Sequence, residues 1–165
     1  MIKVAFFPGA FKPPHVGHYT VVKELLPKVD RLYIFISKKP RDGITAEQSV
    51  KIWKIYLSKS DMEKIIIHIT DTSPILAILD KSLGLTAKDT VYLIKSEKNA
   101  SNKRFGMFRK THLKTIEWIL PTFRTLSSTN MRETIAEKDY KRFHKFMPLH
   151  LSESKIKEVW NIVRK

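Results

Sequence analysis

Short apolar runs alternate along the chain with stretches whose apolar residues recur at helical spacing. The apolar runs predict five β-strands, at residues 3–7, 31–37, 64–69, 90–95 and 115–120. Helical patterns lie between them, at residues 18–26, 45–57 and 73–83. Short apolar strands separated by helices are typical of parallel sheets with both faces covered. We therefore predict an α/β fold with a Rossmann-like, doubly wound parallel sheet of about five strands.

Residues at the helix boundaries support this division. Thr45 and Gln48 form a capping-box pattern that opens one helix. Ser73 and Pro74 are typical of an N-cap and a first helical turn, and Gly84 is typical of the residue after a helix. Doubly wound sheets bind ligands beyond the carboxyl ends of their strands, where the strand order reverses. We therefore expect the functional site at the end of the first strand.

After Pro121 the pattern becomes helical. The Ser-Ser-Thr sequence at residues 127–129 offers N-cap candidates for a helix at residues 131–136, and Ser152 offers one for a last helix. We interpret the apolar stripe of that last helix as core packing; it consists of Ile156, Val159, Trp160 and Val163.

Length and composition limit the class of protein. The 165 residues contain no repeat or linker, so we predict a single domain (1–165) with a core at 1–135 and a helical C-terminal extension at 136–165. The absence of cysteine excludes disulfides and thiolate metal sites. No apolar run approaches the ~18 residues of a membrane span and no signal peptide is recognisable, so we expect a cytoplasmic protein with no membrane partner.

The chain is strongly basic. Its formal net charge of +15 comes from 31 Lys and Arg against 16 Asp and Glu. This excess favours an anionic partner, such as a nucleotide or a nucleic acid, although a lysine-rich, solvated surface gives the same excess. The basic stretch 95–114 can be interpreted as an acceptor-recognition loop, a lid or a nucleic-acid patch, although a solvated loop is the commonest outcome for such a run.

The most distinctive stretch joins the first predicted strand to the first predicted helix. Residues 7–18 read Phe-Pro-Gly-Ala-Phe-Lys-Pro-Pro-His-Val-Gly-His. A glycine turn at a strand end brings backbone N–H groups close to a ligand, and the helix N-terminus adds a partial positive charge. His15 and His18 are three residues apart, so both rings are expected on one helix face, and Gly17 leaves room for a phosphoryl group. We interpret the stretch as a phosphate-binding site.

Three segments, in this order, resemble the nucleotidyltransferase α/β-phosphodiesterase superfamily. Residues 9–18 match its (H/T)xGH signature. Residues 37–40 (Ser-Lys-Lys-Pro) and 44–47 (Ile-Thr-Ala-Glu) resemble the loop and helix start after the second strand of its adenylyltransferases. Residues 126–132 (Leu-Ser-Ser-Thr-Asn-Met-Arg) resemble their ISSTxxR segment. The resemblance covers about residues 1–135, and its motifs are closest to those of pantetheine-phosphate and nicotinamide-mononucleotide adenylyltransferases.

The resemblance implies transfer of an NMP group, with AMP favoured, from a nucleoside triphosphate to a small phosphorylated acceptor, with release of pyrophosphate. Such an in-line displacement needs positioning and charge neutralisation more than a strong base. The implied catalytic residues are His15, His18, Lys38 and Arg132. The implied nucleotide-binding residues are Pro8, Gly9, Ala10, Phe11, Gly17, Ser127, Ser128 and Thr129.

The expected cofactor is Mg²⁺, held mostly by phosphate oxygens and therefore without dedicated protein ligands. Weaker candidates for acceptor binding are Lys12, Lys39, Lys95 and Arg104. The arginine pair that pantetheine-phosphate enzymes carry after the fourth strand is replaced here by Lys-Ser-Glu-Lys-Asn at residues 95–99. Within the turn, two positions depart from the family pattern. Ala10 stands where pantetheine-phosphate enzymes carry a hydroxyl residue, and Lys12 replaces an acidic or polar residue and adds positive charge beside the phosphates. The acceptor, the choice of ATP or CTP, and whether the chain forms a homo-oligomer stay open.

Other readings of the same residues remain. One is a cytidylyltransferase that uses CTP on a phospho-alcohol or a sugar phosphate. Another is a catalytically inactive, nucleic-acid-binding Rossmann module, suggested by the basic stretches 95–114 and 138–145. A tRNA-synthetase-like core would also carry a His-x-Gly-His pattern, but the chain is short for it and lacks a KMSKS loop. A zinc site at the two histidines would need a third ligand and more commonly has i, i+4 spacing. The remaining histidines are interpreted as structural or surface residues; they are His68, His112, His144 and His150.

Overall fold

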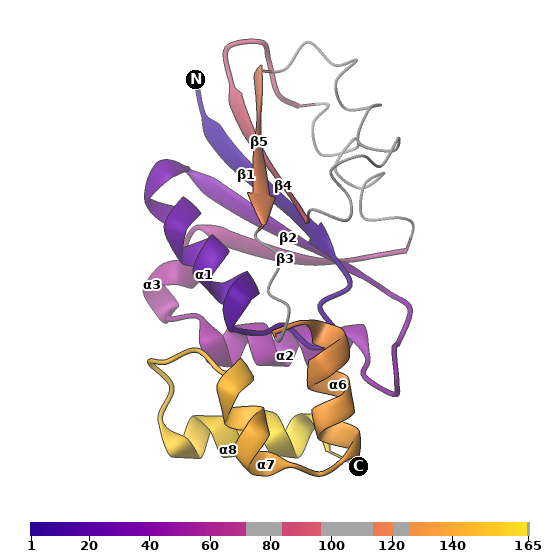
Figure 1. Cartoon of the computed structure of the whole chain (residues 1–165). Helices are drawn as coiled ribbons and strands as arrows, with labels where there is room; N and C mark the ends of the chain where they lie inside the picture. Colours follow the sequence, from indigo (N-terminus) through magenta and orange to yellow (C-terminus); the bar gives the residue numbers. More distant parts are fainter. Residues whose placement is uncertain (72–83, 97–113, 121–125, 165) are drawn as a thin grey trace.

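The computed structural model of the chain describes residues 1–71, 84–96, 114–120 and 126–164 (Figure 1). The five predicted strands form one parallel sheet in the order β3-β2-β1-β4-β5. Their bounds are Lys3–Gly9 for β1, Arg31–Ser37 for β2, Ile65–Thr70 for β3, Thr90–Ser96 for β4 and Lys114–Leu120 for β5. The predicted fold class is confirmed, with strand ends within two residues of those expected.

Helices follow the strands as the boundary residues indicate. Their bounds are Val16–Leu25 for α1, Leu26–Lys28 for the 3-10 turn η1, Ala46–Tyr56 for α2, Lys59–Met62 for α3, Ser128–Ala136 for α6, Tyr140–Phe143 for α7, His144–Phe146 for the 3-10 turn η4 and Glu153–Val163 for α8. Both bonds of the predicted capping box are present, since Thr45 accepts from the Gln48 N–H and the Gln48 side chain accepts from the Thr45 N–H. The helix expected at residues 73–83 lies outside the described residues.

The strand order reverses at β1, the central strand. β1 pairs with β2 as far as Gly9, which lies opposite Ile36, but with β4 only as far as Phe6, which lies opposite Leu93. The carboxyl end of β1 is therefore paired on one side only. This is the place where doubly wound sheets bind their ligands.

Successive side chains of β1 lie on opposite faces of the sheet. Ala5 and Phe7 belong to a large core with α1, α2 and the C-terminal helices, whereas Val4 and Phe6 belong to a smaller cluster on the opposite face. Figure 1 shows α6, α7 and α8 grouped beyond the carboxyl end of β1. The main core thus extends from the sheet into the C-terminal helices.

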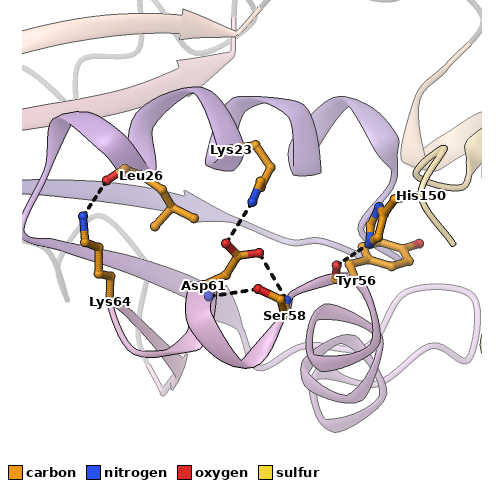
Figure 2. A network of polar contacts seen from close by, with 7 residues as sticks. All are labelled: Lys23, Leu26, Tyr56, Ser58, Asp61, Lys64 and His150. Atoms are coloured by element: carbon orange, nitrogen blue, oxygen red, sulfur yellow. Dashed lines mark hydrogen bonds and ion pairs between the residues drawn. The ribbon is translucent and has the colours of Figure 1, made fainter.

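Polar contacts fix residues 58–64 against α1 and η1 (Figure 2). These residues include α3, a short helix that the sequence analysis missed. Lys23 and Asp61 form an ion pair of 2.9 Å. Asp61 and Ser58 cap each other's backbone N–H groups at 3.2 and 3.1 Å. The Lys64 ammonium group donates to the Leu26 carbonyl at 3.1 Å, where a cation is favoured beside unpaired helical carbonyls.

Side-chain contacts also attach the C-terminal extension to the core helices. The His150 ring stacks on Tyr19 with centroids 4.8 Å apart. Its Nε2 lies 2.9 Å from the Tyr56 carbonyl oxygen (Figure 2). The Gln48 amide group donates to the Ile162 carbonyl at 3.0 Å. His150 thus has a structural role, as expected from the sequence. Within the described part of the chain, no helix combines the length and hydrophobicity that crossing a bilayer requires.

Candidate active site

His15 and His18 cap the N-terminus of α1 reciprocally. His15 is the N-cap residue, and its Nδ1 accepts a hydrogen bond of 3.0 Å from the Gly17 N–H. His18 Nδ1 accepts one of 3.1 Å from the His15 N–H. The two rings stack with centroids 3.8 Å apart and planes at 27°. The expectation that both rings lie on one face of the helix is confirmed.

These bonds determine where each ring carries its proton. Because each Nδ1 accepts a backbone hydrogen bond, each neutral ring carries its hydrogen on Nε2. Burial lowers the pKa of His15 to about 4, and burial together with the neighbouring His15 lowers the pKa of His18 well below its usual range. A second proton would also have to occupy Nδ1 and remove the cap. At neutral pH the pair therefore provides two uncharged Nε2–H donors.

The turn before the histidines is built around a buried Phe11. Its φ of 49° lies in the left-handed region, which is uncommon for a residue with a side chain. The Phe11 ring packs edge-on against Phe7, His18 and Trp53, with centroids 4.9, 5.0 and 5.5 Å away. A Cβ atom on Gly9 would lie 3.0 Å from two carbons of that ring, so a side chain at this position would force the ring to shift. Phe11 therefore shapes the turn through packing, and its side chain faces the core.

Every carbonyl oxygen from Ala10 to His15 accepts a hydrogen bond from the protein, and all the donors except Lys12 lie outside this turn. The donors, in chain order of the carbonyls, are Lys12 Nζ, Ser49 Oγ, Arg132 Nη1, Ser128 Oγ, Tyr56 Oη and Tyr19 N. The lone pairs of these carbonyls are thus engaged by protein donors, which reduces their repulsion toward an anion bound at the turn. The sequence analysis missed Ser49 and Tyr56. The available signal was a hydroxyl group on the buried face of a helix, which needs a hydrogen-bond partner.

The N-terminus of α6 lies directly against this turn. Ser127 is its N-cap and accepts from the Asn130 N–H at 3.1 Å, and the Ser128 hydroxyl donates to the Pro13 carbonyl at 3.0 Å. The first N–H groups of a helix have no partner within it and favour anions. The fold therefore brings together two of the motifs that the sequence analysis singled out, although more than a hundred residues separate them.

Arg132 connects three segments around the turn. Its guanidinium group is 2.7 Å from an Asp42 carboxylate oxygen, 2.9 Å from the Lys12 carbonyl and 3.3 Å from the Thr129 hydroxyl. The side chain is only 12% exposed. Asp42 was not predicted. A signal was present in the Asp42-Gly43 pair, a common turn sequence, and both residues have positive φ.

The lysine candidates occupy two kinds of environment. Lys38 directly follows β2 and is 68% exposed, with its ammonium group 3.3 Å from Asp71, and Lys39 is exposed beside it. Lys12 and Lys95 are buried, the first against backbone carbonyls and the second 2.7 Å from Glu117. The expectation that Lys12 presents its charge to an acceptor does not agree with this placement, because its side chain turns inward. Arg104 lies outside the described residues.

One relative resembles this chain along most of its length, and another along about a third of it. The chain is 27% identical over 154 residues to nicotinamide-nucleotide adenylyltransferase of Pyrobaculum aerophilum, covering 84% of this chain and 79% of the relative. A 56-residue stretch is 38% identical to phosphopantetheine adenylyltransferase of Aquifex aeolicus, of which it covers 35%.

The solved structures show the same fold. Nicotinic acid mononucleotide adenylyltransferase of Plasmodium falciparum, complexed with APC, superposes with a TM-score of 0.66 at 13% identity, covering 98% of this chain and 96% of that one. A bifunctional NMN adenylyltransferase/ADP ribose pyrophosphatase of Francisella tularensis, complexed with AMP and a manganese ion, superposes with a TM-score of 0.64 at 15% identity. This match covers 98% of this chain and 51% of the Francisella chain. A sequence model of the family described as cytidylyltransferase-like matches residues 6–134. The chain, with its histidine-capped turn and the α6 N-terminus beside it, belongs to the cytidylyltransferase-like family.

Proposed function

We propose that the protein is an adenylyltransferase that transfers AMP from ATP to a small phosphorylated acceptor and releases pyrophosphate. The observation that carries the proposal is the junction of two anion-binding elements, the paired Nε2–H donors of α1 and the N-terminus of α6, through the bond from Ser128 to Pro13. One element fits an α-phosphate and the other fits the β- and γ-phosphates. The relatives named as adenylyltransferases support ATP as the donor.

In the proposed reaction an oxygen of the acceptor phosphate attacks the α-phosphorus of ATP in line with the bond that breaks. A new phosphorus–oxygen bond forms, and pyrophosphate leaves with the electron pair of the bond to the bridging oxygen. The acceptor phosphate is already largely ionised at neutral pH, so no protein base is needed. The protein has to align two polyanions and stabilise the charge that develops between them.

Each group has a role that follows from its position. His15 and His18 donate Nε2–H bonds to α-phosphate oxygens without adding charge. Lys38, at the end of the strand beside β1, bridges the acceptor and the α-phosphate. The N–H groups of α6 and the Thr129 hydroxyl bind the leaving pyrophosphate. Arg132 completes that site with the donors not used on Asp42, Thr129 and the loop.

The chemistry of this donor set also fits a metal–triphosphate complex. The site presents N–H, ammonium, guanidinium and hydroxyl donors, which bind phosphate oxygens and do not compete for a metal ion. We propose Mg²⁺ as the ion, since it keeps most of its waters and is commonly held by phosphates. When bound it would neutralise charge on the triphosphate. The manganese ion in the Francisella structure supports the use of a divalent cation.

A screen for pyrophosphate release tests the proposal. Each of ATP, CTP, GTP and UTP is combined with nicotinamide mononucleotide, nicotinate mononucleotide, phosphopantetheine, phosphocholine or a sugar 1-phosphate. We expect release with ATP and a mononucleotide, because the relative that covers most of the chain is named for that acceptor. Release with CTP and a phospho-alcohol would assign the cytidylyltransferase reading instead. No release from any pair, together with salt-dependent binding to RNA or DNA, would favour the inactive nucleic-acid-binding reading.

A further inference from the structure

Lys12 has an environment that is unusual for a lysine. Its side chain is fully buried beneath the turn that would bind phosphate. Its ammonium group donates to the Ala10 carbonyl at 2.6 Å and to the Ser37 carbonyl at 2.7 Å. Lysine is almost never fully buried without partners, since removing its charge from water is costly. These two short, charge-assisted bonds offset that cost.

The two carbonyls mark the point at which two neighbouring strands end. Gly9 of β1 and Ile36 of β2 form the last residue pair between these two strands. Ala10 and Ser37 are the next residues along each strand, so the ammonium group continues the link between the strands one step beyond their backbone ladder. Lys38, whose ammonium group the proposed reaction uses, directly follows Ser37.

We propose that Lys12 is a positioning residue for nucleotidyl transfer, because it clamps the carboxyl ends of β1 and β2 together and so sets Lys38 relative to His15 and His18. This inference rests on the proposed function. Lys12 is also held at its own backbone, where Arg132 donates to its carbonyl at 2.9 Å. Its ammonium group and its backbone carbonyl are therefore both held by hydrogen bonds within the protein.

The charges around the ammonium group agree with this role. Burial, with a smaller contribution from Arg41 in the loop after β2, lowers the pKa of Lys12 to about 8, while Glu47 on α2 acts in the opposite direction. At neutral pH the group therefore remains mostly protonated and keeps its bonds charge-assisted.

Steady-state kinetics of Lys12→Met separates positioning from stability. With the nucleotide and acceptor found in the screen, we expect kcat to fall about 10- to 100-fold while KM for ATP changes less than about 3-fold, because misplacement of about an ångström acts on the chemical step. Lys12→Arg keeps the charge and the donors and should recover most of kcat. Lys51→Met, which removes an exposed lysine from α2, is the matched control and should keep the wild-type kcat.

Each outcome decides the inference. A kcat of Lys12→Met within twofold of wild type, measured per folded molecule, would show that Lys12 is only a structural residue. If that variant does not fold, Lys12→Gln takes its place, and an unchanged kcat overturns the inference in the same way. A wild-type chain that transfers no nucleotide overturns the proposed function and this inference with it, whereas an active wild type with unaffected variants overturns the inference alone.

Discussion

At the scale of single residues, His15 and His18 each use one ring nitrogen for the fold and leave the other for a ligand. The Nδ1 atoms complete the capping of α1, and the Nε2–H groups remain as donors. The spacing of the two histidines was enough to predict that their rings share a face. The N-cap role of His15 was not predictable, because Ser, Thr, Asp and Asn are the residues that usually occupy this position.

The first prediction concerns the donor of His18. His18→Ala removes one hydrogen bond to the α-phosphate, so kcat should fall about 10²- to 10³-fold, as expected for a transition-state donor. The variant also loses the Nδ1 acceptor that caps the His15 N–H, and its free energy of unfolding should fall by about 1 kcal/mol. Pyrophosphate release at saturating ATP measures the first effect. His68→Ala, which removes an exposed ring on β3, is the control, and equal rates for the two variants would refute the role.

The second prediction concerns pH. The pKa of His15 is about 4 in the folded protein against an ordinary value of 6.5, so the unfolded chain binds a proton first as the pH falls. Stability is therefore lost between pH 6.5 and pH 4, and from pH 7 to pH 5 His15 alone accounts for about 2 kcal/mol. The pKa of His18 is also lowered in the folded protein, so His18 adds to the loss of stability as the pH falls.

Urea unfolding at pH 7 and pH 5 measures this loss. His15→Ser is the matched variant, since serine retains an N-cap acceptor but does not titrate in this range. The loss of free energy on acidification should be smaller in His15→Ser by about the 2 kcal/mol assigned to His15. Equal losses in the two proteins would mean that His15 is not held neutral by the fold.

At the scale of elements, the turn from Ala10 to His15 is held by donors from α1, α2 and α6 as well as by Lys12. The strands and the main helices were predictable because apolar periodicity and capping residues are local signals. The identity of these donors was not, because Ser49 and Tyr56 reach the turn only once α2 packs beneath it. α3 was missed because its four residues are too few to show a period.

The third prediction tests one of these donors. Tyr56→Phe removes the hydroxyl that donates to the buried Pro14 carbonyl at 2.8 Å, and should destabilise the protein by about 1–3 kcal/mol. Tyr140→Phe removes an exposed hydroxyl that bonds Glu153, and should cost less than about 1 kcal/mol. Chemical denaturation compares the two. A larger loss in Tyr140→Phe would show that the Tyr56 hydroxyl does not hold the turn.

At the scale of the whole molecule, the C-terminal helices and the sheet share one core. Val159 of α8 is fully buried in the same cluster as Leu25 of α1 and Trp53 of α2. The sequence pattern predicted that the α8 stripe packs inward. The pattern could not predict which helix packs against the stripe, because that helix is α2, about a hundred residues earlier in the chain. We expect residues 1–165 to unfold as a single domain.

The fourth prediction follows from that shared core. Val159→Ala should lower the free energy of unfolding by about 2 kcal/mol while the chain still unfolds in one transition. Leu149→Ala, at a 98% exposed position, should change it by less than about 0.5 kcal/mol. Because Trp53 and Trp118 also emit, both are replaced by phenylalanine in the reference protein and in the variants. The fluorescence of Trp160 then reports on the extension, and far-UV circular dichroism reports on the whole chain. Separate midpoints for the two signals would indicate that the extension is an independent unit.

The central claim is that this site moves a nucleotidyl group, and following the α-phosphate tests it most directly. ATP carrying a radioactive α-phosphate is incubated with the protein, Mg²⁺ and the acceptor found in the screen. We expect the label to appear in a dinucleotide product, with one pyrophosphate released per product and both formed about 10²- to 10³-fold more slowly in His18→Ala. Label recovered only as free AMP or ADP, or as unreacted ATP, would contradict the account.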